Sequence, residues 1–342
     1  SLKSGVIFFG KELEKFENNF TKKYNLKYGL AVGSGTDAIY LSLLSMNIGP
    51  GDEVITVSNS AIPTVSAINS CGAKAKFVDV DSNYLIDVNK IKDQITKKTK
   101  AIIPVHLYGQ SCDMEKIYKI AKKYRLKIIE DCAQAQGAKF KNKFVGSYGD
   151  TGCFSFYPTK ILGAYGDGGA FTTNDHQLAD KVAKIRNYGQ SQKYHHDELG
   201  WNSRLDTLQA AILLVKLASL PDSNNARRSI AKTYREQLAH LPVEIPVERQ
   251  YAEHVYHQFV IQVDKRDELR TFLEQQGIQT GIHYPIPIHK LKVFAEKDFS
   301  RGNFPVTETV ADKLLSLPIF PELTEVEIAK VIQAISTFYG QN

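Results

Sequence analysis

The sequence predicts an α/β fold with a mostly parallel sheet, followed by a smaller α+β domain. Short apolar runs rich in β-branched residues alternate with segments of helical periodicity, which is typical of strand–helix–strand units. Six such runs are predicted strands, at residues 53–57, 75–80, 101–106, 126–131, 152–156 and 169–173. Helices are predicted between and after them, at residues 37–46, 62–71, 87–95, 113–124, 175–187 and 203–220.

The pattern changes after Pro221, where the smaller domain is predicted to begin. A polar-faced helix, a half-exposed strand and two further helices are expected there, at residues 225–238, 255–263, 266–277 and 324–337. Gly277 closes the helix that precedes it, because glycine is favoured where a helix ends. We therefore predict a large domain over residues 1–220, including the N-terminal segment, and a small C-terminal domain over residues 221–342.

The composition is that of a globular protein acting on small molecules. The chain has 342 residues, of which 43% are hydrophobic and 23% charged, with a net charge of +6. This charge is too small and too evenly mixed for nucleic-acid binding, although it suits anionic substrates. No apolar run approaches the roughly 20 residues that span a bilayer, and no signal peptide opens the chain. We expect a cytoplasmic protein that contacts neither membrane nor nucleic acid.

The cysteines and histidines do not form a metal-binding motif. His195 and His196 are adjacent and lack a nearby third ligand, so no metal is expected. The cysteines show neither zinc-ribbon spacing nor a disulfide framework, so reduced thiols are expected at Cys71, Cys112, Cys132 and Cys153.

Three short stretches carry candidate chemistry, and each also has a plain structural explanation. "GSGT" (33–36) precedes a helix whose free N–H groups could bind phosphate, although a capped turn also explains it. Asp131 ends a buried strand, where ligands sit in open α/β sheets, although it could simply cap a helix. Lys160 stands between an apolar stretch and a glycine run, where partial desolvation would make its amine nucleophilic, although loop lysines are usually solvated.

These three features have a joint meaning that none has alone. Pyridoxal 5'-phosphate needs a phosphate cup, an acid that keeps its ring nitrogen protonated, and a lysine for its aldehyde. The combination therefore favours this cofactor over three unrelated structural explanations.

The same stretches resemble a known family over essentially the whole chain. The sequence is similar to the DegT/DnrJ/EryC1/StrS group of pyridoxal-phosphate-dependent sugar aminotransferases, which have the aspartate-aminotransferase-like fold (fold type I). The matching stretches, in order, are "GSGTDAIYLSL", "GPGDEVI", "FVDVD", "AIIPVHLYGQ", "IIEDCAQAQGA", "GDTGCFSFYPTKILGAYGDGGA", "RNYGQSQKYHHDELGWNSRLDTLQAAIL" and "GIHYPIPIH".

The resemblance implies a role for each cofactor-binding residue. Lys160 would carry the cofactor through an imine bond and move protons, and Asp131 would pair with the pyridine nitrogen. Gln134 would lie beside the ring near its phenolic oxygen. Asn202 would reach across a homodimer interface to the phosphate bound by the partner subunit. The remaining phosphate contacts would come from Gly35, Thr36 and Ser155.

The resemblance also indicates where substrate binds, and one position departs from the family. His283 and Tyr284 fall where relatives contact the sugar, and Tyr157 is a further substrate candidate. Arg204 could bind glutamate carboxylates or the diphosphate, although a structural ion pair is an equal explanation. Many relatives place an aromatic residue against the cofactor ring at the position of Ala61, where alanine cannot stack.

The subgroup is narrowed by "NSRL" (202–205), where relatives that aminate carbon 4 usually have "NYRM". Together with "KYHH" (193–196) it resembles enzymes that move the glutamate amino group to carbon 3 of a nucleotide-linked keto sugar. A dTDP-linked 3-keto-6-deoxyhexose is expected, for amino sugars of lipopolysaccharide O-antigen or S-layer glycans, with a UDP-linked 3-keto sugar as the alternative. A lysine at 160 argues against a dehydratase, and no cysteine setting indicates a desulfurase. A non-catalytic regulatory or binding role also stays open.

Overall fold

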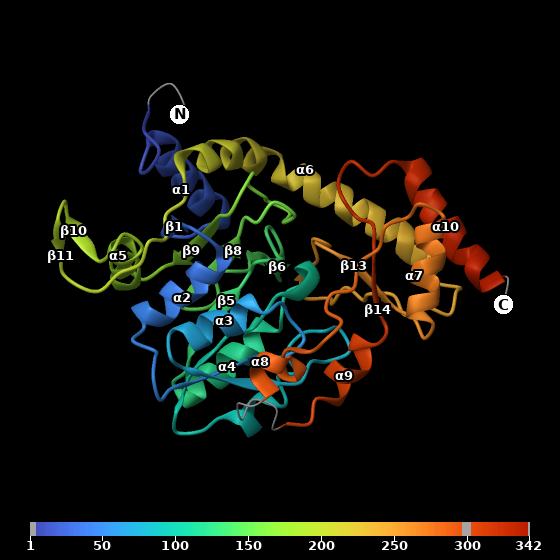
Figure 1. Ribbon diagram of the computed structural model, residues 1–342, viewed down its shortest axis with the longest axis horizontal. Helices are drawn as coiled ribbons and strands as arrows, with labels where there is room; N and C mark the ends of the chain where they lie inside the picture. The colour runs from blue at the N-terminus through green and yellow to red at the C-terminus, as the bar shows by residue number, and fades with distance from the viewer. Residues whose placement is uncertain (1–4, 296–301, 341–342) are drawn as a thin grey trace.

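The computed structural model describes residues 5–295 and 302–340, and a seven-stranded sheet lies at its centre (Figure 1). The strand order is β1-β9-β8-β5-β4-β2-β3, and β9 alone runs antiparallel to its neighbours, so the sheet is mostly parallel as predicted. The strands are β1 (Tyr28–Val32), β2 (Glu53–Val57), β3 (Lys74–Val78), β4 (Thr99–Ile102), β5 (Lys127–Asp131), β8 (Thr151–Ser155) and β9 (Gly169–Thr173).

Helices cover both faces of this sheet. Val54 and Ile55 are successive residues of β2, yet they belong to separate apolar cores because side chains alternate across a strand. One core holds residues of α2, α3 and α5, and the other holds residues of α4. Burial on both faces explains why the strands read as continuous apolar runs. The helices are α1 (Lys11–Tyr24), α2 (Gly35–Ser45), α3 (Pro63–Ser70), α4 (Met114–Tyr124) and α5 (His176–Ile185).

The C-terminal part has a core of its own. A two-stranded antiparallel sheet pairs Phe259 with Leu317, and helices pack around it at one end of the molecule (Figure 1). The elements are β13 (Phe259–Gln262), β14 (Leu314–Leu317), α7 (Arg266–Gln275) and α10 (Glu325–Gly340). Between them the chain returns to the large sheet, where Ile288 and Phe304 join the core beside α2 and α3. This returning segment contains η4 (Ile288–Lys290), α8 (Lys292–Ala295) and α9 (Pro305–Ala311).

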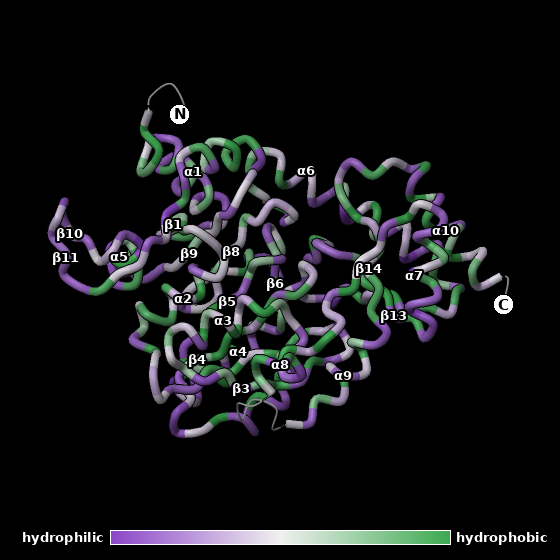
Figure 2. The backbone as a smooth tube through the Cα atoms, viewed as in Figure 1, coloured by the Kyte–Doolittle hydropathy of each residue, from purple (hydrophilic) through white to green (hydrophobic). Residues whose placement is uncertain are grey.

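Short elements complete the fold. A two-stranded hairpin projects beside α5, and Figure 2 shows that it is mostly hydrophilic. A three-stranded sheet joins two short strands from the connection between β5 and β8 to one strand from the segment after α6 (Thr207–Leu238). These strands are β10 (Gln190–Gln192), β11 (His195–His196), β6 (Lys139–Phe140), β7 (Lys143–Phe144) and β12 (Ala252–Glu253). No helix within residues 5–295 and 302–340 is both long enough and apolar enough to cross a bilayer.

Three predicted helices differ from the structure. The helix predicted at 87–95 is only the 3₁₀ turn η2 (Ile91–Gln94). The Asp87 carboxylate accepts a hydrogen bond of 3.0 Å from the Asn89 amide, and this local turn competes with helix formation. The helices predicted on either side of Pro221 are one continuous helix, α6 (Thr207–Leu238).

The continuity of α6 follows from packing at both of its ends. Proline inside a helix costs about 3 kcal/mol, because it donates no hydrogen bond and crowds the preceding turn. Leu213 and Leu217 are buried in the core beneath α1, whereas Ile230 and Tyr234 are buried in the C-terminal core. These contacts outweigh the local penalty. The predicted domain division at residue 220 thus falls inside one helix, and we retain it as a proposal.

Candidate active site

A cavity of about 250 Å³ lies at the carboxyl ends of several strands of the large sheet. It is bordered by residues that follow β1, β5 and β8 at their carboxyl ends, where ligands bind in open α/β sheets. Seven predicted site residues line it: Gly35, Thr36, Asp131, Gln134, Ser155, Tyr157 and Lys160. Ala61 lines it as well, so the position where relatives carry an aromatic ring does border this cavity.

The N-terminus of α2 forms one wall of the cavity. Ser34 caps this helix, because its hydroxyl accepts a hydrogen bond of 3.0 Å from the Asp37 amide. Within the described residues, no acceptor pairs with the amides of Gly35 and Thr36, so both remain available to a bound anion. A Cβ on Gly35 would lie 2.7 Å from the Cβ of Ser155, which is why only glycine fits here.

Asp131 is buried with half of its hydrogen-bonding capacity unused. Its side chain accepts 2.7 Å from the Thr64 hydroxyl and 3.1 Å from the Ala133 amide, one bond at each oxygen, and the residue is 4% exposed. A carboxylate has about four acceptor sites, and a buried one requires compensating charge or donors. The arrangement therefore suits a cationic N–H group inside the cavity.

The carboxylate of Glu130, the preceding residue, has protein hydrogen-bond donors at all of its acceptor sites. Its two oxygens accept from the amides of Gly146 (2.9 Å), Tyr148 (2.7 Å) and Gly149 (2.8 Å), and from His106 Nε2 at 3.0 Å. The Cys112 amide donates to His106 Nδ1, which leaves the His106 proton on Nε2, facing Glu130. Glu130 thus fixes the loop after β7 rather than binding a ligand.

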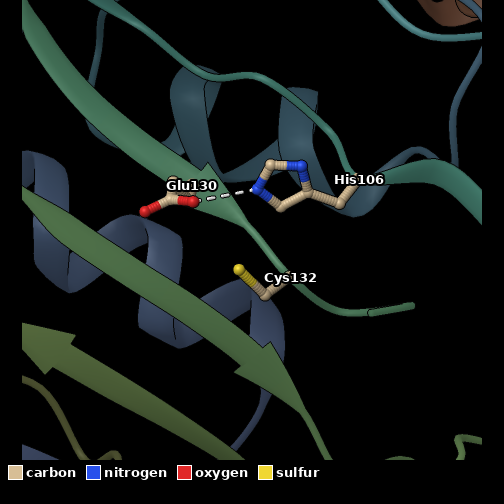
Figure 3. A group of neighbouring side chains, drawn as sticks. All are labelled: His106, Glu130 and Cys132. Carbon is tan, nitrogen blue, oxygen red and sulfur yellow. Dashed lines mark hydrogen bonds and ion pairs between the residues drawn. The ribbon is translucent and has the colours of Figure 1, made fainter. Parts of the chain in front are cut away.

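Figure 3 shows that Glu130, His106 and Cys132 point toward one another. One potential ligand atom from each lies within 4.8 Å of the others, as a metal site would require. However, the nitrogen and oxygen atoms already have protein partners, and burial raises the pKa of the Cys132 thiol well above its usual range. Metal binding needs the thiolate, so we assign this cluster to the fold.

Lys160 stands in a tight turn that orients its side chain toward the cavity. Its amide donates to the Tyr157 carbonyl at 2.8 Å, and the Ala164 amide donates to Phe156 at 2.7 Å. Within the described residues its ammonium group forms no hydrogen bond or ion pair, and it is the one lysine that lines the cavity. Burial lowers the pKa of Lys160, and the negative charge of Asp131 opposes this shift. The side chain is poised to act as a free amine.

Gln134 connects the cavity to the predicted sugar-contacting residues. The Tyr108 amide donates to Gln134 Oε1 at 2.8 Å, and Gln134 Nε2 donates to the Tyr284 hydroxyl at 3.0 Å. Burial raises the pKa of Tyr284 to about 12, so it remains a phenol at neutral pH. His283 bonds the Ser316 hydroxyl at 2.9 Å, and burial, reinforced by the charge of Lys160, lowers the pKa of this imidazole.

Four predicted site residues lie outside the cavity lining: His283 and Tyr284, described above, and Asn202 and Arg204. Asn202 is exposed, beside Ser203, whose hydroxyl accepts from Gly33 at 3.0 Å and so connects this segment to the start of α2. Arg204 donates to Asn187 at 3.0 Å and packs against the rings of Phe8 and Tyr188. The roles assigned to Asn202 and Arg204 stay predictions.

Sequence reasoning missed Thr64 and Tyr108 as functional residues. Thr64 lies in the first turn of α3, which follows β2, and belongs to "SNSAIPTVSA". Tyr108 lies in "AIIPVHLYGQ", so both occupy stretches that follow strands, where a site was expected. The sequence shows that a polar group follows a strand at each position, but it does not show that Thr64 bonds Asp131 or that Tyr108 bonds Gln134.

Comparison with known proteins identifies the family. The sequence pattern of the DegT/DnrJ/EryC1/StrS aminotransferase family matches residues 1–336. The chain belongs to this family. The predicted α/β fold is also confirmed, and so is the predicted class of enzyme, a pyridoxal-phosphate-dependent sugar aminotransferase.

Individual relatives match over nearly the whole chain. The sequence is 47% identical over 338 residues to the dTDP-3-amino-3,6-dideoxy-alpha-D-galactopyranose transaminase of Aneurinibacillus thermoaerophilus, covering 98% of this chain and 93% of that protein. It is also 47% identical over 315 residues to the UDP-N-acetyl-3-dehydro-alpha-D-glucosamine 3-aminotransferase of Acidithiobacillus ferrooxidans, covering 92% and 85% respectively. The crystal structure of S. venezuelae DesV, in complex with a ketimine intermediate, matches with a TM-score of 0.96 and 40% identity over 99% of this chain and 92% of that one.

The residues of the cavity fit the family's cofactor. The unpaired amides at the start of α2 suit its phosphate, and the open acceptor sites of Asp131 suit its protonated ring nitrogen. Lys160, unpaired and partly desolvated, suits its aldehyde. The cysteines offer no rival nucleophile, because all four are buried and burial raises the pKa of every one, at Cys71, Cys112, Cys132 and Cys153.

Glu130→Gln is expected to destabilise the protein. In either orientation, the new amide NH₂ group would face N–H donors that now bind the carboxylate, leaving buried donors unpaired at a cost of about 1–3 kcal/mol. The midpoint of thermal unfolding should fall measurably. Glu274→Gln, at an exposed position on α7, is the control and should leave it unchanged. Equal midpoints for both variants would contradict the anchoring role of Glu130.

Proposed function

We propose that the chain transfers the amino group of glutamate to carbon 3 of a dTDP-linked 3-keto-6-deoxyhexose. The observation that carries the chemistry is the side chain of Lys160, whose pKa is lowered by burial, in a cavity that also holds the half-satisfied carboxylate of Asp131. The substrate class is supported by the dTDP-sugar transaminase of A. thermoaerophilus, which is 47% identical.

The residues divide the work between binding and proton transfer. The amides of Gly35 and Thr36 would hold the cofactor's phosphate, and Asp131 would hold the proton on its ring nitrogen. Bound pyridoxal phosphate supplies an electron-withdrawing ring that stabilises negative charge on the carbon beside the reacting nitrogen. Lys160 Nζ accepts a proton from the α-carbon of glutamate and, in the second half of the reaction, delivers one to carbon 3 of the sugar. A lowered pKa favours the neutral amine that the first of these transfers needs.

We further propose that His283, Tyr284, Tyr157 and Arg204 contact the substrates. Tyr284 is supported most directly, since it bonds Gln134 at the edge of the cavity. A UDP-linked 3-keto sugar is the second candidate, because the A. ferrooxidans relative of that specificity is also 47% identical. In either case, the product is an amino sugar of the kind used in cell-surface glycans, and we propose that it is made in the cytoplasm.

A substrate panel tests this proposal. dTDP-linked and UDP-linked 3-keto sugars, each as gluco and galacto epimers, are offered with glutamate, and the amino product is detected by mass spectrometry. We expect the highest kcat/KM with a dTDP-linked 6-deoxy sugar. A higher kcat/KM with a UDP-linked sugar would select the second candidate, and amination of none of them would reject both.

Lys160→Ala is expected to lower turnover by about a thousandfold, the contribution of a well-placed general base. Cofactor should still bind through α2 and Asp131, which absorbance after dialysis can measure. Lys122→Ala, at an exposed position on α4, serves as the control. Partial recovery with added methylamine would support the role, whereas substantial turnover without any added amine would contradict it.

A homodimer is part of the proposal, with Asn202 reaching the phosphate bound by the partner. It is supported by exposed apolar side chains in the N-terminal segment and next to Asn202, among them Ile7 (63% exposed), Phe9 (47%) and Trp201 (52%). Isolated exposed apolar residues are ordinary, but a cluster of them marks an interface.

Asn202→Ala is therefore expected to weaken cofactor retention and to shift the dimer toward monomer at micromolar concentration. Dialysis followed by absorbance measures the first effect, and analytical ultracentrifugation measures the second. Asn225→Ala, at an exposed position on α6, is the matched control. Unchanged cofactor affinity in the Asn202 variant would show that the proposed contact across the interface is wrong.

A further inference from the structure

Tyr108 lies outside the cavity lining, yet it forms hydrogen bonds with both Gln134 and His283. It belongs to η3 (Leu107–Gly109) and is 3% exposed. Its amide donates to Gln134 Oε1 at 2.8 Å, and its hydroxyl donates to the carbonyl of His283. Within the described residues, no other donor reaches that carbonyl. One buried residue thus holds Gln134 from one side and the 283–284 segment from the other.

The first of these bonds decides which way the Gln134 amide faces. A backbone N–H is only a donor, so the atom that it meets on Gln134 must be the oxygen. The amide nitrogen then faces Tyr284, and its bond of 3.0 Å makes the Tyr284 oxygen an acceptor. The phenolic proton of Tyr284 is left free to donate, and within the described residues it has no acceptor. This makes Tyr284 a donor for an oxygen of the substrate.

The backbone of Tyr108 is held in an unfavourable conformation by neighbours from the C-terminal part of the chain. Its φ of 57° and ψ of 3° lie in the left-handed region, which bulky residues rarely adopt. The Gln258 amide donates to the Tyr108 carbonyl, and the Val255 amide donates to the carbonyl of Gly109 at 3.0 Å. A Cβ on Gly109 would lie 2.9–3.1 Å from this segment, so glycine is needed for the approach. Strain maintained by such contacts is typical of functional positions.

We propose that Tyr108 is a positioning residue for sugar binding: it orients Gln134 so that Tyr284 donates to the sugar, and its hydroxyl fixes the backbone that carries Tyr284. This inference rests on the proposed function, because it takes His283 and Tyr284 as sugar contacts. It assigns a role to the "PVHLYGQ" stretch, which neither cofactor binding nor proton transfer uses.

Tyr108→Phe removes the hydroxyl and keeps the ring and the backbone bond to Gln134. The His283 carbonyl then loses its donor, and we expect KM for the keto sugar to rise about tenfold, the usual effect of one unpaired buried group. The KM for glutamate and the absorption maximum of the bound cofactor should stay unchanged. Tyr84→Phe is the control: its ring packs against that of Tyr108 at 5.4 Å, and it is 5% exposed against 3% for Tyr108. Within the described residues, no hydrogen bond joins its hydroxyl to Gln134 or to the 283–284 segment.

A binding measurement separates this inference from the catalytic proposal. Calorimetry with dTDP-glucose and cofactor-free protein should show about tenfold weaker affinity for Tyr108→Phe than for Tyr84→Phe. Tyr284→Phe should match Tyr108→Phe, and the double variant should lose little more than either alone, because the two groups act through one contact.

The outcomes are distinct. Equal KM and affinity for Tyr108→Phe and Tyr84→Phe, in a protein whose wild type aminates a sugar, would overturn the role of Tyr108. Parallel losses in the KM values for glutamate and sugar would also overturn it, since they indicate general disorder of the site. A wild-type protein that aminates none of the sugars would instead reject the proposed function.

Discussion

The buried carboxylate of Glu130 is the interaction on which the site depends. It lies at the end of β5 with four donors around it, three of them backbone amides of one loop and the fourth His106. A buried charge without such partners would cost several kcal/mol, so the loop and the strand end are obliged to stay together. Because His106 is two residues from Tyr108, the same bond also fixes where η3 begins.

Strand geometry turns this anchor into a catalytic arrangement. Side chains alternate across a strand, so Glu130 and Asp131 face opposite sides of the sheet although they are neighbours in sequence. The carboxylate of Glu130 accepts hydrogen bonds from four protein donors. The carboxylate of Asp131 lines the cavity and accepts from only two. Two identical functional groups therefore have different roles, and the number of protein donors around each one distinguishes them. Because Glu130 is held by these bonds, the neighbouring Asp131 is held in place as well.

The sequence predicted the features that depend on local pattern. β2 is predicted at its observed bounds of Glu53–Val57. Asp131 is predicted from its place at a strand end, and Lys160 from its place between an apolar stretch and a glycine run. Features that depend on distant contacts were missed. Thr64 is 67 residues from the carboxylate that it bonds, and Pro221 was interpreted as a boundary because the two cores that hold α6 together are invisible to local propensity.

The same dependence on distant contacts explains why the proposed sugar-binding residues are harder to predict from the sequence than the proposed cofactor-binding residues. The proposed cofactor-binding groups lie at or shortly after the ends of β1, β5 and β8, so the sheet places them. Tyr284 instead follows the C-terminal core and returns to the large sheet, where it meets Gln134 across a separation of 150 residues. Its position is set by hydrogen bonds rather than by the sheet, and those bonds pass through Tyr108. The proposed sugar contacts thus depend on bonds made by η3, whereas the proposed cofactor contacts depend on the strand ends.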